Sequence, residues 1–379
     1  MSKALDFANS NLGDGEFTGF RLPSGTTGER PATGNAGDLR FNTTTGSMEF
    51  WSSEDFTPQW RDIDDPPVPT PLMRYLIVAG GGAGGTYDST GNGGSSYTAG
   101  SNGSDSVFGS LTAVGGGGGG VHSSQYAGSD GGSGGGGGSS YTSVDTGGGE
   151  PTEGQGNRGG DGTGSGNPWA GGGGGGAGEA GEDAPSASQA GDGGDGLSSD
   201  IISTSLATTH SVGEVISSAV WFAGGGGGTR YTNSTSTDGG KGGGGNGRTS
   251  SSGNADVTDG AANTGGGGGA FDNVVGAGHG GGGAGGLLTA SNVALTLDSA
   301  YNLTVGAGGN QTATNHSDGG SGVIIIRTQT GLTATFTEGV TVNGTTTSST
   351  QAVSGISYDG DLVWIIKAAS SDTVTFASS

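Results

Sequence analysis

The chain of 379 residues contains no cysteine, so neither disulfides nor thiol chemistry can contribute to it. Only 12 residues are Lys or Arg against 35 Asp or Glu, and the net charge of −23 argues against nucleic-acid binding through phosphates. No apolar run approaches the ~20 residues of a membrane span, and residues 1–6 lack the apolar region of a secretory signal. We therefore expect neither membrane insertion nor classical export.

Apolar residues make up only 28% of the chain, which is thin for a conventional core, whereas glycine supplies 94 residues. Gly/Ser-rich chain usually behaves as flexible coil, because glycine loses the most backbone entropy on ordering. Here, however, four polyglycine runs each follow a short strand-like segment, at residues 75–79, 111–114, 220–223 and 303–305. Their β-branched and aromatic residues favour an ordered domain.

Polyglycine can be ordered in two known ways. A collagen helix needs glycine at every third position, and this chain has no such period. The alternative is the polyproline-II-like conformation of glycine itself, a left-handed threefold helix without internal hydrogen bonds. Because such helices have no side chains, they can approach closely and bond sideways through their backbones. We therefore predict a core that is held together by backbone hydrogen bonds and buries little apolar surface.

Residues 1–65 have a more ordinary composition and are predicted to form a separate β module. Residues 38–42 and 47–51 read as two strands around a Thr/Gly turn, and residues 59–63 read as a third strand. A sheet this small rarely stands alone, so we expect it to oligomerise. Residues 66–74 are rich in proline and are predicted to be a semi-rigid linker.

The module also resembles a known family. Gly28-Glu29-Arg30-Pro31, then Asp38-Leu39-Arg40-Phe41-Asn42, a Thr/Gly turn, Glu49-Phe50-Trp51 and Trp60 are similar to a small β-module of bacteriophage tail fibre and other virion proteins. The resemblance covers about residues 25–63. It implies attachment to a fibre or baseplate, and assembly as a homotrimer.

The glycine-rich domain, predicted over residues 75–328, resembles domains of marine bacteriophage fibre proteins. The elements that carry this resemblance are residues 75–82, 106–115, 193–201, 262–269 and 319–327, of which the last reads Gly-Gly-Ser-Gly-Val-Ile-Ile-Ile-Arg. Similar glycine-rich tips on other phages are host-recognition adhesins made of stacked polyglycine helices with receptor-binding distal loops. The insert at residues 202–215 departs from the pattern.

Residues 329–379 are predicted to form a small C-terminal β domain. Short strands are expected at residues 334–337, 340–342, 355–358, 362–367 and 373–376. Turns at Glu338-Gly339, Asn343-Gly344 and Asp359-Gly360 separate them. The whole chain is thus predicted to be all-β plus polyglycine-II, with essentially no α-helix.

Motifs for catalysis and metal binding carry little weight in this composition. Residues 131–135 (Gly-Gly-Ser-Gly-Gly) satisfy a nucleophile-elbow pattern, but no helical periodicity follows. The histidines, which are His122, His210, His279 and His316, lack ligand-like spacing, so each is expected to be a loop residue. Calcium could bind the acidic loop at residues 191–196, although a solvated loop is favoured. We therefore predict no catalytic residue, metal or cofactor.

Aromatic residues in the spacers are more informative. They lie among Gly, Ser, Thr and Asn, a composition that recurs in recognition loops and can also stack on sugar faces. They could instead be ordinary packing over the glycine stack. As candidate receptor-binding residues we select Tyr87, Tyr97, Tyr126, Tyr141, Trp169 and Tyr231.

Two functional hypotheses follow. In the first, the chain is a non-enzymatic phage fibre adhesin that attaches to other virion proteins through residues 1–65 and binds a bacterial surface glycan or protein. It would then reside in the virion and be extracellular after lysis. The alternative is a structural decoration or filament subunit without receptor binding. An ice-binding role is less consistent, because flat Thr or Ala faces are not evident.

Overall fold

A computed structural model describes residues 22–35, 38–52, 59–62, 70–88, 96–122, 127–142, 146–164, 169–186, 189–230, 237–249, 257–272, 277–311 and 317–379. The chain divides into two compact units, Met1–Thr70 and Pro71–Ser379. Strands dominate both units, and the described residues contain a single α-helix, so the all-β prediction is confirmed.

The first unit is a four-stranded sheet in the order β1 (Ser24–Gly25), β2 (Leu39–Asn42), β3 (Ser47–Ser52) and β4 (Gln59–Asp62). A short 3₁₀ helix, η1 (Thr27–Glu29), follows β1. The predicted β2–β3 hairpin and the third strand are confirmed by their pairing. Linker residues 66–69 lie outside the described residues, whereas Leu72, Met73 and Arg74, also assigned to the linker, begin strand β5 (Leu72–Val78) of the second unit.

Polar side chains fill the inner face of the first unit. Glu49 is 1% exposed, accepts hydrogen bonds from Arg30 and from Asn42 (Nδ2, 2.7 Å), and lies 3.7 Å from the Arg40 guanidinium. Burial alone would raise the pKa of Glu49, but the hydrogen bonds from Arg30 and Asn42 and the two arginine charges lower it. Leu39 and Phe41 alternate with the buried positions of β2 and are therefore exposed.

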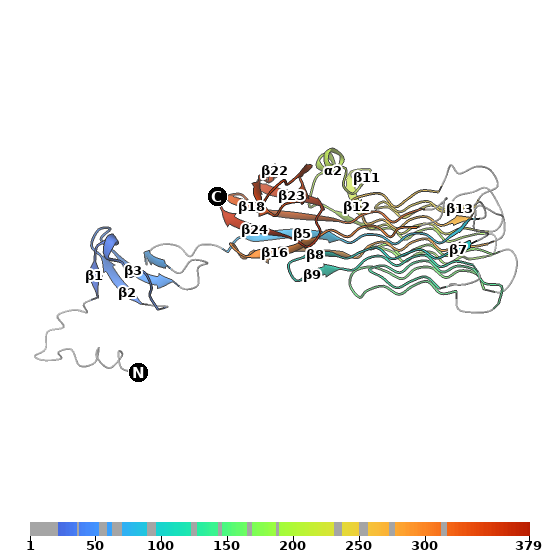
Figure 1. The fold of residues 1–379 in the computed structure, drawn as a ribbon, viewed down its shortest axis with the longest axis horizontal. Helices are drawn as coiled ribbons and strands as arrows, with labels where there is room; N and C mark the ends of the chain where they lie inside the picture. The colour runs from blue at the N-terminus through green and yellow to red at the C-terminus, as the bar shows by residue number, and fades with distance from the viewer. Residues whose placement is uncertain are drawn as a thin grey trace, which may run out of the picture. The chain divides into compact units, whose positions relative to one another are not determined.

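The second unit begins with two stacked sheets (Figure 1). The first sheet consists of β15 (Leu287–Ala294), β5, β17 (Val323–Gln329), β23 (Asp361–Ala368), β19 (Thr341–Val342), β20 (Thr345–Thr346) and β22 (Ile356–Tyr358). Strand β17 contains the Val-Ile-Ile-Ile-Arg sequence of residues 323–327, which is called the signature strand below. The second runs β21 (Gln351–Val353), β18 (Leu332–Phe336), β24 (Asp372–Ser378), β16 (Ala300–Thr304), β8 (Ser106–Phe108) and β9 (Leu111–Ala113). Ile324, Trp364 and Phe376 are fully buried between the sheets.

A third layer covers the outer face of the first sheet. It consists of β10 (Leu197–Ser199), β12 (Ala219–Phe222) and β11 (Glu214–Ile216) together with helix α2 (Thr204–His210). Ser203 caps the helix by accepting a hydrogen bond from the Leu206 N–H at 3.2 Å. Phe222 and Ile202 pack against Ile325, so β17 is buried on both faces, which explains its uninterrupted apolar run. The insert at residues 202–215 thus supplies part of this layer.

Residues 329–379, which the sequence predicts as a small C-terminal β domain, lie in the second compact unit together with the glycine-rich segment. Strand β23 pairs with β17 over six residues, and β24 pairs with β16. Arg327, at the end of the signature strand, donates from Nε to Asp361 at 2.7 Å and from Nη2 to Asp359 at 3.2 Å. The five predicted strands do form, and two of them, β23 and β24, join the others to strands from the glycine-rich segment.

The glycine runs extend from these sheets as a bundle of extended segments without regular strand pairing (Figure 1). In residues 80–85, successive N–H groups donate to three different neighbouring segments in turn. Gly80 and Ala83 donate to residues 104 and 101, Gly81 and Gly84 to 320 and 317, and Gly82 and Gly85 to 283 and 280, at 2.8 to 3.3 Å. Residues 171–176, 224–229 and 280–286 repeat this rotation. The repeat of three is what the polyglycine-II interpretation requires, although that interpretation stays a prediction.

We call this bundle of glycine-rich segments the lattice. Glycine is required in it because neighbouring backbones approach too closely to leave room for a side chain. A Cβ at Gly282 would lie 2.1 Å from the carbonyl oxygen of Gly82, and a Cβ at Gly118 would lie 1.8 Å from that of Gly100. The Gly82 carbonyl oxygen is itself an acceptor, from the Gly268 N–H at 2.9 Å, so it cannot move aside independently.

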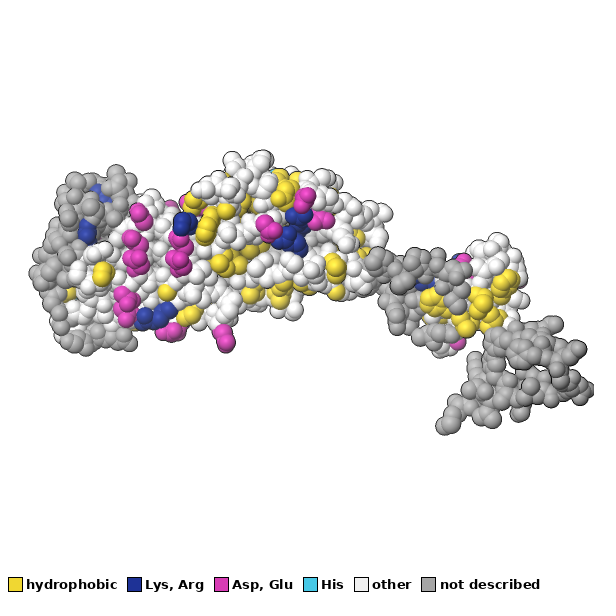
Figure 2. Space-filling model, turned by 180° about the vertical axis from the view of Figure 1, so that it is seen from behind, with side chains coloured by type: hydrophobic (Ala, Val, Ile, Leu, Met, Phe, Trp, Pro, Cys, Tyr) yellow, Lys and Arg dark blue, Asp and Glu magenta, His cyan; other side chains and the backbone are white. Residues whose placement is uncertain are grey.

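At the surface of the lattice, aspartates take the place of a neighbouring carbonyl. Their Oδ1 atoms accept backbone N–H groups of adjacent segments at 2.7 to 3.0 Å, and the residues are Asp105, Asp130, Asp161, Asp183, Asp192, Asp195, Asp259 and Asp318. Figure 2 shows acidic side chains in rows over the glycine-rich part. The acidity of the chain therefore has a structural cause at this edge.

We predict that Gly282→Ala destabilises the second unit by about 3 kcal/mol, because the new methyl group meets a fixed carbonyl oxygen. Gly164→Ala is the matched control, since a Cβ at Gly164 meets nothing within 4 Å. Urea unfolding of both variants checks this. Equal stability of the two variants would contradict the close-packed lattice.

Candidate functional site

The end of the lattice opposite the C-terminus carries a small sheet in the order β13 (Arg248–Thr249), β14 (Phe271–Asp272), β6 (Thr86–Asp88) and β7 (Ser96–Thr98) (Figure 1). Tyr87 and Tyr97 are directly opposite each other in the β6–β7 pair. They therefore share a face, with ring centroids 4.6 Å apart.

Further rings join these two tyrosines. The Tyr97 ring lies 5.8 Å from His122 and 5.9 Å from His279, and the His122 ring lies 4.1 Å from Tyr141 and 4.9 Å from Trp169. The Tyr141 and Trp169 rings meet edge to face at 4.7 Å. We call the set Tyr87, Tyr97, His122, Tyr141, Trp169 and His279 the tip cluster.

The lattice explains why residues so distant in sequence converge. His122 and Tyr141 follow polyglycine runs, whereas Trp169 and His279 precede them. The runs are held in register next to the cluster, since Gly280 donates to Gly120, Gly120 to Gly136, and Gly172 to Gly137, each at 2.9 Å. Because the ends of these runs are aligned, the aromatic residues next to them lie side by side.

Four of the six predicted receptor-binding residues lie in this cluster, namely Tyr87, Tyr97, Tyr141 and Trp169. Tyr126 and Tyr231 lie outside the described residues. Tyr141 is the most exposed at 56%, and the other three are half-buried. The cluster is therefore reachable from solvent on the Tyr141 side.

Sequence reasoning missed His122 and His279, which were predicted to be loop residues. Both side chains are fully buried. His122 Nδ1 lies 2.9 Å from the Ser139 carbonyl oxygen, which can only accept, so this nitrogen carries the proton. His279 Nδ1 accepts the His122 backbone N–H at 3.3 Å, so in the neutral ring its proton is on Nε2. The position of each histidine beside a polyglycine run is the only sequence signal for them.

The remaining ring nitrogens are unusual. Neither His122 Nε2 nor His279 Nε2 has a hydrogen-bond partner among the described residues, and both are buried. From the tautomers above, the first is a bare acceptor and the second an N–H donor. Leaving such a group unpaired costs about 1–3 kcal/mol, so most buried polar atoms in proteins have partners.

The cluster is electrically neutral. Burial, and secondarily the neighbouring His122, lower the pKa of His279 to about 3, and burial also lowers the pKa of His122. Burial, with smaller contributions from Tyr141, Tyr87 and Asp272, raises the pKa of Tyr97 to about 12. At neutral pH the two Nε2 atoms thus offer one uncharged hydrogen-bond donor and one uncharged acceptor beside the aromatic faces of the cluster.

Other candidate sites offer less chemistry. Ser133, the nucleophile of the elbow pattern, is fully buried within the lattice, and a bend and lattice segment follow it in place of a helix. In the acidic loop, Asp192 and Asp195 already accept backbone N–H groups at 2.8 and 2.9 Å. No group of three or more His, Asp or Glu within the described ranges could hold a metal ion.

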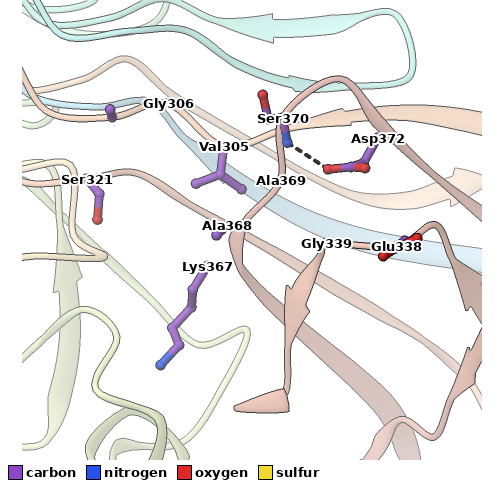
Figure 3. Close-up of a pocket in the computed structure, with 11 residues that line it drawn as sticks. Val305, Gly306, Ser321, Glu338, Gly339, Lys367, Ala368, Ala369, Ser370 and Asp372 are labelled. Atoms are coloured by element: carbon purple, nitrogen blue, oxygen red, sulfur yellow. Dashed lines mark hydrogen bonds between the residues drawn. The ribbon is translucent and has the colours of Figure 1, made fainter. Parts of the chain in front are cut away.

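A groove of about 470 Å³ lies beside the ends of β16 and β23 (Figure 3). The Lys367 amine points away from Glu338 and Asp372 and donates to the His210 carbonyl oxygen at 3.0 Å. Asp372 accepts the Ser370 N–H at 2.7 Å. The Lys367 and Asp372 side chains at this groove are thus engaged in hydrogen bonds with the backbone, whereas Glu338 is exposed.

None of the protein-family models, curated proteins or solved structures compared with this chain matches it. Among the described residues, no helix is long and apolar enough to cross a membrane. The tip cluster is therefore the candidate site on the strength of its own geometry.

We predict that the buried neutral histidines make stability depend on pH. Because the pKa of folded His279 is far below its ordinary value of 6.5, the unfolded chain binds the proton more readily. The contribution is complete above about pH 6.5 and is lost as pH falls toward 3, at up to ~1.4 kcal/mol per pH unit. Urea unfolding at pH 7 and pH 5 should give a larger difference for the wild type than for His279→Phe. A His279 ring that titrates near pH 6.5 by NMR would contradict this.

Proposed function

We propose that this chain is a non-enzymatic bacteriophage fibre adhesin that presents its tip cluster to the host surface. The observation that carries the proposal is the convergence of Tyr87, Tyr97, Tyr141 and Trp169 at one end of the glycine lattice. Tyrosine and tryptophan give large contact areas at a low cost in conformational entropy, which suits recognition.

The lattice supports this role mechanically. Its segments have almost no side chains to reorder, and each is bonded to three neighbours. Rings mounted on such a frame are pre-organised, and pre-organisation lowers the entropic cost of binding a receptor. An exposed, rigid group of aromatic rings is therefore suited to contacting a surface glycan or protein.

The first unit is proposed to attach the chain to other virion proteins and to assemble it as a homotrimer, so that the chain resides in the virion. Leu39 and Phe41 are 38% and 37% exposed, and their strand partners Phe50 and Met48 share the same face. Figure 2 shows hydrophobic side chains gathered on this module. Because its inner face is polar, the apolar outer face is the natural surface for self-association.

We expect fluorescently labelled protein to bind saturably to the bacteria that the parent phage infects. Trp169→Ala and Tyr141→Ala should weaken this binding at least tenfold, because they remove exposed contact area from the tip cluster. The matched control is Trp221→Ala, since Trp221 packs against Lys241 outside the cluster. Wild-type protein that does not bind a susceptible strain would favour the structural decoration or filament subunit.

Self-association is expected to depend on the apolar face of the first unit. Leu39→Lys combined with Phe41→Lys should convert the assembly to monomers, because two charges would have to be buried in the interface. Thr43→Lys adds one such charge at an exposed position outside this face and should leave the assembly intact. Sedimentation equilibrium measures the mass of each form. A monomeric wild-type chain would rule out the homotrimer.

A further inference from the structure

We propose that the tip cluster is a binding site for an uncharged carbohydrate, in which a pyranose hydroxyl group bonds to His122 Nε2 and His279 Nε2. The inference rests on the proposed adhesin function and specifies its ligand. The sugar ring stacks on Tyr141 and Trp169, and its hydroxyl replaces the missing partners of the two histidines.

The two imidazoles are complementary to a hydroxyl group. His122 Nε2 can only accept, since its Nδ1 proton is directed to the Ser139 carbonyl. His279 Nε2 can only donate, since its Nδ1 accepts the His122 N–H. A hydroxyl both donates and accepts, so one hydroxyl, or two on adjacent sugar carbons, satisfies both nitrogens.

The absence of charge selects among ligands. The pKa values of His279, His122 and Tyr97 are all displaced toward the neutral form, so the rings offer no ion to pair with an anion. A cation would face the positive end of the His279 N–H. A neutral, hydroxyl-rich ligand meets none of these obstacles.

The same hydrogen bonds argue against a metal ion at this pair. A metal ligand needs a lone pair on each nitrogen, but His279 Nε2 carries its proton as long as Nδ1 accepts the His122 N–H. Moving that proton would set two N–H groups against each other.

Access to the buried nitrogens requires side chains of the tip cluster to move. Tyr141 lies against His122 with ring centroids 4.1 Å apart, and it is 56% exposed. Exposed side chains change rotamer within nanoseconds, so the Tyr141 ring can swing aside and then close over the sugar. Trp169, whose ring lies 4.7 Å from Tyr141 and 4.9 Å from His122, supplies the second stacking face.

The test uses the full-length chain labelled with ¹⁵N-histidine, because ring-nitrogen resonances report directly on both Nε2 atoms. Neutral methyl hexopyranosides, including methyl galactoside, are titrated at pH 7. Methyl galacturonide serves as the matched anion, and tetramethylammonium as the cation. We expect saturable shifts of His122 and His279 with at least one neutral glycoside, no shifts with the two ions, and an unchanged His210.

Variants separate hydrogen bonding from packing. His122→Phe and His279→Phe keep a ring in place but remove the nitrogen, and each should weaken glycoside binding at least tenfold. Because these buried changes could impair folding, Tyr141→Ala, at an exposed position, is the second variant, with Trp221→Ala as its control. Tyr141→Ala should also weaken binding, and Trp221→Ala should not.

The outcomes distinguish the two proposals. Shifts with the galacturonide or tetramethylammonium alone would overturn the neutral-sugar site. Binding to susceptible bacteria without shifts from any neutral glycoside would overturn it as well, while leaving the adhesin function intact. If the wild-type protein does not bind susceptible bacteria at all, both the adhesin function and the neutral-sugar site are overturned.

Discussion

The structure of the second unit depends on one constraint, which is how closely two backbones can approach when neither carries a side chain. Carbonyl oxygens lie about where a Cβ would be, for example 2.1 Å from the Cβ position of Gly82. At this spacing each N–H reaches a neighbouring segment directly, so the hydrogen-bonding demand of the backbone is met between segments. Glycine loses much conformational entropy on ordering, and a dense set of backbone bonds with tight packing offsets that loss.

At the boundary of such a lattice, some N–H groups of the outer segments have no neighbouring carbonyl oxygen to donate to. Aspartate side chains supply the missing acceptor: Asp259 Oδ1, for example, accepts the Asp318 N–H at 2.8 Å. The apolar sheets close the other end of the unit. Each abundant residue type is therefore concentrated in one part of the unit: glycine lies inside the lattice, aspartate along its edges and β-branched residues in the sheets.

Much of this arrangement could be predicted from the sequence. The apolar segments before the glycine runs are strands β5, β9, β12 and β16, because β-branched and aromatic residues have few other stable options there. The C-terminal strands form where the sequence predicts them, and they lie in the same compact unit as the glycine-rich segment. Pairing between β17 and β23 sets Ile326 opposite Trp364 across a large separation in sequence, which a local pattern does not encode. Four of the six residues of the tip cluster, its tyrosines and its tryptophan, were selected from the sequence because they stand out in the composition. His122 and His279 were not, because only the register between glycine runs far apart in sequence brings them next to these rings.

The rotation of hydrogen bonds among three neighbours also constrains how such a protein can change over time. Adding one residue within a run would turn everything beyond it by a third of a turn and set each N–H against the wrong neighbour. Adding three would restore the pattern but push the end of that run out of line with the others. Insertions are therefore confined to the connections between runs, where length is free. The body would stay nearly constant in length while its connecting segments diversify, so that new binding properties could arise without a new fold.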